Sequence, residues 1–364
     1  MDAGACNADT LILVNGDERS ALGERARWIA RAVPGKAAVV HRTGGRGVAI
    51  ARFVRRLRAD RPRVVYLVDA AVATVTAGAW ARRHGARVVL DTGDAIGALT
   101  RSTGQLGAVG AAGAPWLERL AYATADTLVV RSVGLAQHVR SMSDRPVLVV
   151  PDGYDPEAAH AIDGGAERRR WTFAEDETVV GVVGSAHWNA RLHWCYGRDV
   201  VEAVAAARRH DVRGLVLDRG DGQPHLQALA RERGVSDRVV FDDPGSPAET
   251  WHRLAAMDVA LSTQTNDLVG WSRTTGKLVQ YMAAGRYVLA SRVGAAASLL
   301  PPQMLVDYHG AWDEGYFGRL AERVTALPDR RALAEQGGRL RDLAEPFAYP
   351  NLVETLRASV FGAR

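Results

Sequence analysis

A short segment in the last third of the chain combines residue types that bind phosphate. Thr274, Thr275 and Gly276 lead into Lys277, and apolar residues follow at helical spacing, which puts Lys277 and Gln280 together on the other face of the first turn. A helix start carries unpaired N–H groups and a partial positive charge, so it can hold a phosphate group. The same pattern also fits an ordinary buried helix followed by a strand, because short motifs often mislead.

Polar side chains also follow two apolar runs of the first half. Asp91 and Asp94 come directly after the run at 88–90, and Asn15 comes directly after the run at 10–14. In an open parallel sheet, ligands bind at the carboxyl ends of the strands, where such carboxylates would orient the hydroxyl groups of a ligand. Asp-Thr-Gly-Asp is equally good turn chemistry, so a purely local role fits as well.

The elements that must position these residues alternate between strands and helices, which predicts two doubly wound α/β domains with parallel sheets. The turn after the first strand lacks Gly-x-Gly-x-x-Gly, which disfavours a dinucleotide dehydrogenase. The Gly- and Ala-rich stretch at 97–115 is predicted to be a mobile loop or a frayed helix. The expected strands lie at 10–14, 37–40, 64–68, 88–90, 178–184, 212–218, 238–241 and 258–262, and the main expected helices at 24–33, 47–58, 71–84, 226–233 and 249–257.

A chain of 364 residues is long enough for two domains of common size. The polar connection at 158–176 is the best candidate for the boundary between them. We therefore predict a first domain at 1–160, a second at 161–340, and C-terminal helices at 341–364 that pack back on the first domain.

The charge is basic, with a net charge of +5 and a pI of about 9.4, and almost all of it comes from arginine, because lysine occurs only at Lys36 and Lys277. No zinc-finger spacing, RNP motif or basic zipper accompanies the charge, so a nucleic-acid partner is not expected. The arginine-rich helix at 52–58 is either a solvated face or a contact with an anionic membrane surface.

A few residues indicate the cellular compartment of the protein and whether it binds a metal. The cysteines are Cys6 and Cys195, which gives no disulfide framework and fits the cytoplasm. No apolar run is long enough to span a bilayer, and the first residues lack the pattern of a signal peptide. His187 and His193 have no third ligand in their segment, so no metal is expected.

The run at 280–291, Gln-Tyr-Met-Ala-Ala-Gly-Arg-Tyr-Val-Leu-Ala-Ser, resembles the donor-binding segment of GT-B glycosyltransferases, specifically the retaining family 4 or group 1 enzymes. That family usually has glutamate where Gln280 and Ser272 stand, for the ribose and the donor sugar. Further matches to family patterns lie at 118–126, 146–155 (with Asp152 for the usual asparagine), 212–222, 238–241 and 258–262.

The resemblance implies a GT-B fold, with two Rossmann-like domains facing across a cleft and a C-terminal helix that crosses back to the N-terminal domain. It implies transfer of a sugar, with retention and without a metal, from a UDP- or GDP-sugar to the hydroxyl of a small-molecule, glycan or lipid-linked acceptor. The first domain would bind the acceptor and the second the donor. The composition, rich in arginine and alanine, suggests a bacterial source.

The resemblance and the patterns together give a set of candidate site residues. The two groups expected to stabilise the leaving diphosphate are Arg191 and Lys277, and Asp94 is expected to act at the acceptor. Donor binding is assigned to Gly184, Ser185, Ser272, Thr275, Gly276 and Gln280, and acceptor binding to Asp91, Asp94 and Asn15.

Other functions remain open. Because both family glutamates are replaced, the chain could be a pseudo-glycosyltransferase or a protein of this fold that binds a nucleotide sugar without catalysis. A peripheral membrane or scaffold protein would use the arginine-rich helix instead. An epimerase of the same fold would act on a nucleotide sugar with no acceptor.

Overall fold

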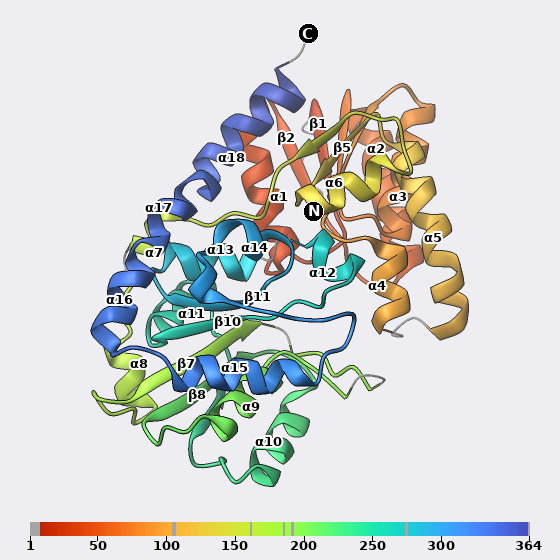
Figure 1. The fold of residues 1–364 in the computed structure, drawn as a ribbon. Helices are drawn as coiled ribbons and strands as arrows, with labels where there is room; N and C mark the ends of the chain where they lie inside the picture. Colours follow the sequence, from red (N-terminus) through yellow and green to blue (C-terminus); the bar gives the residue numbers. More distant parts are fainter. Residues whose placement is uncertain are drawn as a thin grey trace. The chain divides into compact units, whose positions relative to one another are not determined.

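A computed structural model of the chain describes residues 8–362, apart from 104–106, 161, 185, 191–192 and 274–275. The described residues form two compact units, each built on its own six-stranded sheet (Figure 1). The first unit contains the chain up to Asp152, the short stretch at Ser272 and Arg273, and the chain from Tyr349 onward, and the second contains the rest.

The sheet of the first unit is parallel throughout, with the strand order β2-β1-β3-β4-β5-β6. The order reverses between β1 and β3, as in flavodoxin-like domains. The central strands are continuous apolar runs because both of their faces are covered by helices. The strands are β1 (Thr10–Val14), β2 (Ala37–His41), β3 (Val64–Val68), β4 (Arg87–Thr92), β5 (Thr127–Val130) and β6 (Val147–Val149).

Alternate residues of each strand meet different helix layers. Leu11 and Leu13 pack in one cluster with α2, α3, α5 and α6, while Ile12 and Val14 pack in another with α1 and α18. Trp28 of α1 stacks on Tyr349 of α18 with ring centroids 4.5 Å apart, so the C-terminal helix covers this sheet, as predicted. The helices are α1 (Ala21–Ala32), α2 (Arg46–Asp60), α3 (Val72–Arg83), α4 (Ile96–Thr103), α5 (Gly107–Thr124), α6 (Val133–Arg140) and α18 (Tyr349–Leu356), the last followed by a π-turn at Arg357–Phe361.

The stretch predicted as a mobile loop or frayed helix is helical wherever it is described, because α4 and α5 occupy it. The carboxylate of Glu118 is buried and accepts the backbone N–H groups of Ile96 and Gly97 at 3.1 and 3.2 Å. It also accepts hydrogen bonds from Tyr122 and His138. This tertiary cap satisfies N–H groups at the start of α4, which have no partner within the helix.

The sheet of the second unit is also parallel and has the order β12-β11-β10-β7-β8-β9. Read from β9, this is the 3-2-1-4-5-6 order of the classic dinucleotide-binding domain, and it reverses between β7 and β10. The strands are β7 (Thr178–Gly184), β8 (Val212–Asp218), β9 (Val239–Asp242), β10 (Val259–Ser262), β11 (Tyr287–Ser291) and β12 (Leu305–Val306).

Helices surround this sheet, including short ones that the sequence did not predict. The polar connection at 158–176 overlaps α7 and contains α8, and α12 lies between β10 and α13. The helices are α7 (Pro156–His160), α8 (Gly165–Arg170), α9 (Arg198–Ala206), α10 (Gln223–Glu232), α11 (Pro247–Ala255), α12 (Leu268–Ser272), α13 (Gly276–Ala283), α14 (Gly294–Leu299), α15 (Gly315–Thr325), α16 (Arg330–Gly338) and α17 (Leu340–Ala344), with 3-10 turns at Pro302–Met304 and Glu345–Phe347.

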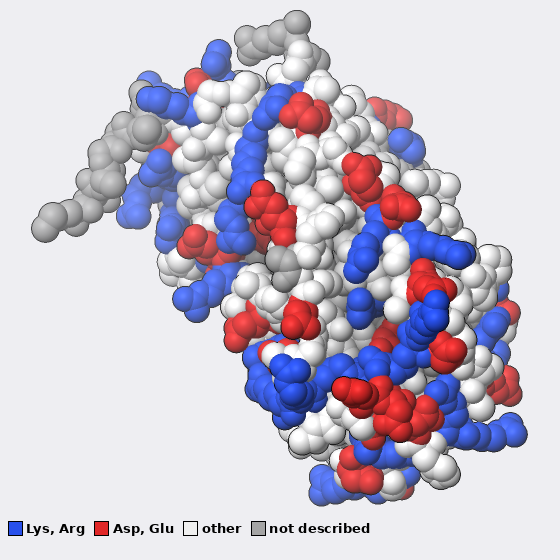
Figure 2. Space-filling model, turned by 90° about the vertical axis from the view of Figure 1, so that its left-hand side faces the viewer, with Lys and Arg blue, Asp and Glu red and all other residues white. Residues whose placement is uncertain are grey.

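Two doubly wound domains are therefore present, as the sequence predicted. Figure 2 shows that arginine and lysine side chains on the face it draws are interspersed with acidic ones, so the basic pI does not make this face uniformly positive. Within the described part of the chain, no helix is both long and apolar enough to cross a bilayer.

Candidate functional site

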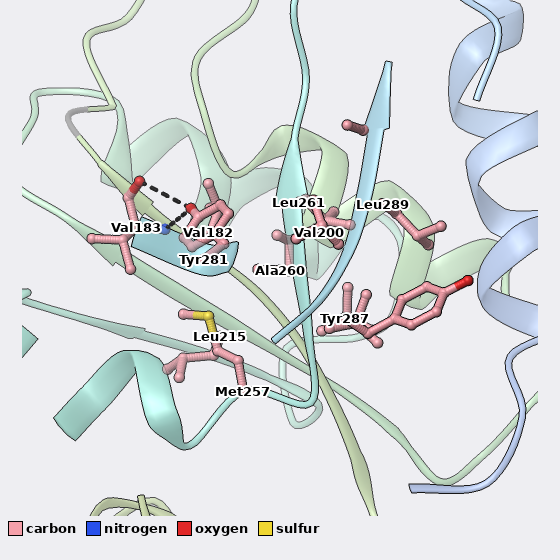
Figure 3. Close-up of a cluster of buried hydrophobic side chains, with 14 of the residues drawn as sticks. Val182, Val183, Val200, Leu215, Met257, Ala260, Leu261, Tyr281, Tyr287 and Leu289 are labelled. Carbon is pink, nitrogen blue, oxygen red and sulfur yellow. Dashed lines mark hydrogen bonds between the residues drawn. The ribbon is translucent and has the colours of Figure 1, made fainter. Parts of the chain in front are cut away.

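Helix α13 is tied to the end of β7 by one buried side chain from its second turn. Tyr281 is fully buried, and its hydroxyl accepts the backbone N–H of Val183 at 2.9 Å (Figure 3). Burial among apolar side chains raises the pKa of Tyr281 above its usual range, so the hydroxyl stays protonated. The tether holds α13 against the strand that borders the reversal of the sheet order.

Lys277, in that first turn, lies between a glycine and an aromatic ring. Its Nζ is 3.3 Å from the ring centroid of Tyr196, a cation–π contact. A Cβ atom built on Gly184, the last residue of β7, would lie 2.5 Å from the same Nζ. Glycine at 184 therefore provides the space that the ammonium group occupies at the carboxyl end of the sheet.

A buried carboxylate lies behind the lysine. Asp199 is fully buried and accepts hydrogen bonds from the backbone N–H groups of Gly197 and Val200 and from Thr263 Oγ1 at 2.7 Å. Burial raises the pKa of Asp199, while the Thr263 hydrogen bond and the charge of Lys277 oppose that shift. The charge of Lys277 thus favours the ionised form of Asp199.

The Tyr196 ring that contacts Lys277 is itself held in place by hydrogen bonds. Gln264 donates from Nε2 to the hydroxyl of Tyr196 at 3.2 Å, and its backbone N–H donates to Ser291 Oγ at 2.7 Å. The position of the ring is thereby linked to the ends of β10 and β11. This end of the second sheet presents a positioned ammonium group beside a glycine and a helix start, which suits an oxyanion such as a phosphate.

The remaining predicted donor residues have different placements. Gly276 is the first residue of α13, and Gln280 is half-buried on that helix. Ser272 is fully buried, and its backbone carbonyl accepts a hydrogen bond from Ser132 Oγ at 2.5 Å within the first unit. Ser185, Thr275 and Arg191 lie outside the described residues.

At the reversal of the first sheet, two polar side chains meet. Asn15 follows β1 and donates from Nδ2 to Asp69 Oδ2 at 2.7 Å, and Asp69 follows β3. Arg42 donates to Asn15 Oδ1 at 3.1 Å, which orients the amide so that its NH2 group faces Asp69. Asn15 was predicted from the sequence, and Asp69 was not.

Asp91 occupies an interior position. It is fully buried, and its carboxylate accepts hydrogen bonds from Arg25 Nε at 2.9 and 3.0 Å and from the hydroxyl of Tyr66 at 2.9 Å, with Arg131 Nε at 3.5 Å. Burial has the largest effect on the pKa of Arg25 and lowers it, but the charges of Asp91, Asp152 and Tyr66 and the hydrogen bond to Asp91 together keep the pKa above its usual value. Asp91 therefore orders the edge of the sheet, whereas the sequence analysis expected it to contact an acceptor.

Asp94, the other carboxylate of the same turn, is accessible. Its side chain is 36% exposed and accepts a hydrogen bond from Arg273 Nε at 2.6 Å within the first unit.

No group of three His, Cys, Asp or Glu side chains suited to a metal occurs among the residues that the structure describes.

Sequence reasoning missed Asp69, Tyr196 and Asp199. Asp69 follows a predicted strand as Asn15 does, so the same rule would have found it. Tyr196 and Asp199 lie in a segment with no strand or turn pattern to single them out, and their contact with Lys277 depends on the tertiary fold.

A surface cavity of about 580 Å³ lies in the first unit, away from Asn15 and Asp69. It is lined by the ends of α2 and α3, including Arg58, Arg61, Trp80 and His84. These helices run antiparallel to the strands, so the cavity lies at the opposite edge of the first sheet from Asn15 and Asp69.

Comparison with known proteins gives one relative in sequence and several in structure. No protein-family model matches this sequence. Over 172 residues the chain is 31% identical to 2-deoxystreptamine glucosyltransferase of Streptomyces kanamyceticus, a match that covers 46% of this chain and 40% of that protein. The chain thus matches about two fifths of the length of this curated relative.

The structural similarity extends over nearly the whole chain. HepE of Anabaena, solved in complex with UDP and glucose, superposes with a TM-score of 0.71 at 17% identity, covering 97% of this chain and 99% of HepE. Sucrose-phosphate synthase of Thermosynechococcus elongatus gives a TM-score of 0.72 at 16% identity, with 98% and 100% covered. WaaG, a glycosyltransferase involved in lipopolysaccharide biosynthesis, gives 0.62 at 16% identity, with 97% and 100% covered.

Proposed function

Because the chain has the GT-B fold of these glycosyltransferases, we propose that it transfers a sugar from a nucleotide-diphosphate sugar to an acceptor hydroxyl. The observation that carries the proposal is the position of Lys277, whose ammonium group lies beside Gly184 at the start of α13. This is the carboxyl edge of a classic doubly wound sheet at its point of reversal, where such sheets bind nucleotides. The complexes of HepE with UDP and with UDP-glucose support a UDP-sugar, and a GDP-sugar is the other candidate.

The proposed chemistry is stabilisation of a leaving diphosphate. As the glycosidic bond breaks, negative charge grows on the diphosphate, and a fixed cation nearby lowers the barrier. Lys277 supplies that cation, together with the backbone N–H groups at the start of α13, and Arg191 is proposed as a second one. With these groups carrying the charge, the reaction needs no metal. We propose retention at the anomeric carbon, with the leaving phosphate helping to deprotonate the acceptor.

The acceptor is proposed to bind the first unit, with Asp94 as the accessible carboxylate that orients it. The similarity to 2-deoxystreptamine glucosyltransferase favours a small cyclic polyol of the cyclitol or monosaccharide type. Retention is checked by proton NMR of the product, whose anomeric coupling constant must match that of the donor. Transfer that persists unchanged in EDTA supports the metal-independent reaction.

Because both family glutamates are replaced, a second function is also consistent with the sequence. Ser272 and Gln280 are uncharged, so contacts with the ribose and the donor sugar differ from those that carboxylates would make. A protein that binds the nucleotide without transferring sugar would show nucleotide binding and no product with any acceptor.

The exposed arginines of α2 offer a contact with an anionic membrane. Arg52, Arg55 and Arg58 are exposed, whereas Phe53 and Leu57 on the opposite face are buried in the core of the first unit. Sedimentation with vesicles that contain phosphatidylglycerol, compared with neutral vesicles, tests this contact. Binding to the anionic vesicles must fall with salt, because Coulomb attraction is screened.

The donor site is tested by thermal stabilisation with UDP, GDP, ADP, TDP and CDP. A nucleotide at one hundred times its Kd adds about 2.7 kcal/mol of stability. We expect one of the five to raise Tm in the wild type and not in Lys277→Ala. Lys36→Ala is the matched control, because Lys36 is exposed and is the other lysine of the chain. Absence of any shift in the wild type would refute the proposed function.

A further inference from the structure

Asp69 sits at the one place in the first sheet where ligand binding is expected from topology. Strands β1 and β3 are neighbours, and the strand order reverses between them. Asn15 and Asp69 are the first residues after these two strands, and their side chains are hydrogen-bonded at 2.7 Å. In doubly wound sheets the ligand crevice lies outside the carboxyl ends of the strands at this point.

The backbone of Asp69 is in a conformation that favours glycine. Its φ angle is +79°, in the left-handed region that side chains other than those of Asn and Asp seldom adopt. The turn is held by backbone groups: the N–H of Asp69 donates to the carbonyl of Asp91 at 2.8 Å, and its carbonyl accepts from Thr74 Oγ1 at 2.6 Å. Glycine would make the same hydrogen bonds with less strain, so the turn itself does not require the carboxylate.

Strain of this kind is retained where a side chain is needed for another purpose. Asp69 is half-buried, and its carboxylate uses only part of its hydrogen-bonding capacity. Oδ2 accepts from Asn15, and the backbone N–H of Ala70 also donates to the carboxylate, which can accept about four hydrogen bonds in all. Burial has the largest effect on the pKa of Asp69 and raises it; Asn15 and Arg131 lower it, and Asp94 adds to the increase. A carboxylate with these surroundings gains from a donor group brought by a ligand.

We propose that Asp69 binds the acceptor, with its carboxylate accepting a hydrogen bond from a hydroxyl or ammonium group of a small cyclic polyol, and with Asn15 and Arg42 fixing its orientation. The inference rests on the proposed function and adds the group that recognises the acceptor. Hydroxyl and ammonium groups share the chemistry that the carboxylate requires. An ammonium group forms the stronger, charge-assisted bond.

The test uses two variants at one position. Asp69→Gly removes the carboxylate and relieves the backbone, and Asp69→Asn keeps the shape in a residue that tolerates positive φ. Acceptor binding is measured by calorimetry with 2-deoxystreptamine and with scyllo-inositol, in the presence of the nucleotide that stabilises the wild type. We expect Asp69→Gly to weaken binding of 2-deoxystreptamine at least tenfold and to weaken scyllo-inositol less. Tm is expected to be equal to or higher than that of the wild type, with the nucleotide shift unchanged.

Arg61→Gly is the matched control, because Arg61 also has a positive φ, of 46°, and is exposed at the end of α2. It should change Tm in the same direction and leave cyclitol binding as in the wild type. A lower Tm in Asp69→Gly with unchanged cyclitol affinity would assign Asp69 a structural role and overturn the inference. Failure of both cyclitols to bind the wild type while the nucleotide shift persists also overturns it. Loss of the nucleotide shift in the wild type instead refutes the proposed function.

Discussion

The two sheets reverse their strand order in the same way but present opposite chemistry at the reversal. In the first unit, the strand ends carry an amide and a carboxylate, Asn15 and Asp69. In the second unit, the corresponding place carries a glycine and a lysine, Gly184 and Lys277. A group that accepts hydrogen bonds suits a polyol or an amine, whereas an ammonium group beside a helix start suits a diphosphate. The same strand reversal thus carries groups of opposite charge in the two units.

The interactions that hold the two sites in place differ as well. The edge of the first sheet is held by buried charges, since Arg25 and Asp91 are both almost fully excluded from solvent. The second site combines hydrogen bonds of neutral groups, such as that between Tyr281 and Val183, with the buried carboxylate of Asp199. Removing one support from each unit therefore tests whether the comparison is correct.

The largest effect is expected from Arg25→Met. It leaves Asp91 as a buried carboxylate without its main cation, and breaking a buried pair in this way costs about 3–5 kcal/mol. The free energy of unfolding, measured by urea denaturation, should fall by that amount. The nucleotide shift should persist while the protein is folded, because the change is confined to the first unit.

The control is the double variant Arg25→Met, Asp91→Asn, which removes the uncompensated charge. It should recover much of the lost stability, because an amide costs less to bury than a carboxylate. A double variant no more stable than Arg25→Met would mean that packing of the arginine, rather than its charge, supports this sheet edge.

The fold was predictable because apolar runs alternate with amphipathic segments along the whole chain. The position of Lys277 in the first turn of a helix was also predictable, since a helix start is visible in sequence. The difference in burial between Asp91 and Asp94 was not predictable, because both residues follow the same strand. The burial of Asp91 is decided by Arg25, 66 residues earlier, and by Tyr66, 25 residues earlier. The positive φ angle of Asp69 was not predictable either, because nothing in the sequence Val-Asp-Ala-Ala indicates it.

A smaller effect is expected from Gly184→Ala in the second unit. The added Cβ would lie 2.5 Å from Lys277 Nζ and only 3.0 Å from its Cε, so the end of the lysine side chain must move. We expect the Kd for the stabilising nucleotide to rise about tenfold, which corresponds to about 1.4 kcal/mol. Calorimetric titration measures it. Gly47→Ala in α2 is the control, because a Cβ there meets no atom within 4 Å, and its nucleotide affinity should equal that of the wild type.

The smallest effect is expected from Tyr281→Phe, which removes the hydroxyl that accepts the N–H of Val183. A buried donor left without its partner costs about 1–3 kcal/mol, and the lower end applies because the same hydroxyl no longer has to be desolvated. Urea denaturation should show a loss of about 1 kcal/mol, together with a weaker nucleotide shift, because α13 is no longer tied to β7. Tyr287→Phe is the control, since the Tyr287 hydroxyl is 3.5 Å from the Gln303 carbonyl and forms at most a weak bond. If Tyr281→Phe loses stability but keeps the full nucleotide affinity, the tether supports the core without positioning Lys277, and the second site depends on Asp199 and Tyr196 instead.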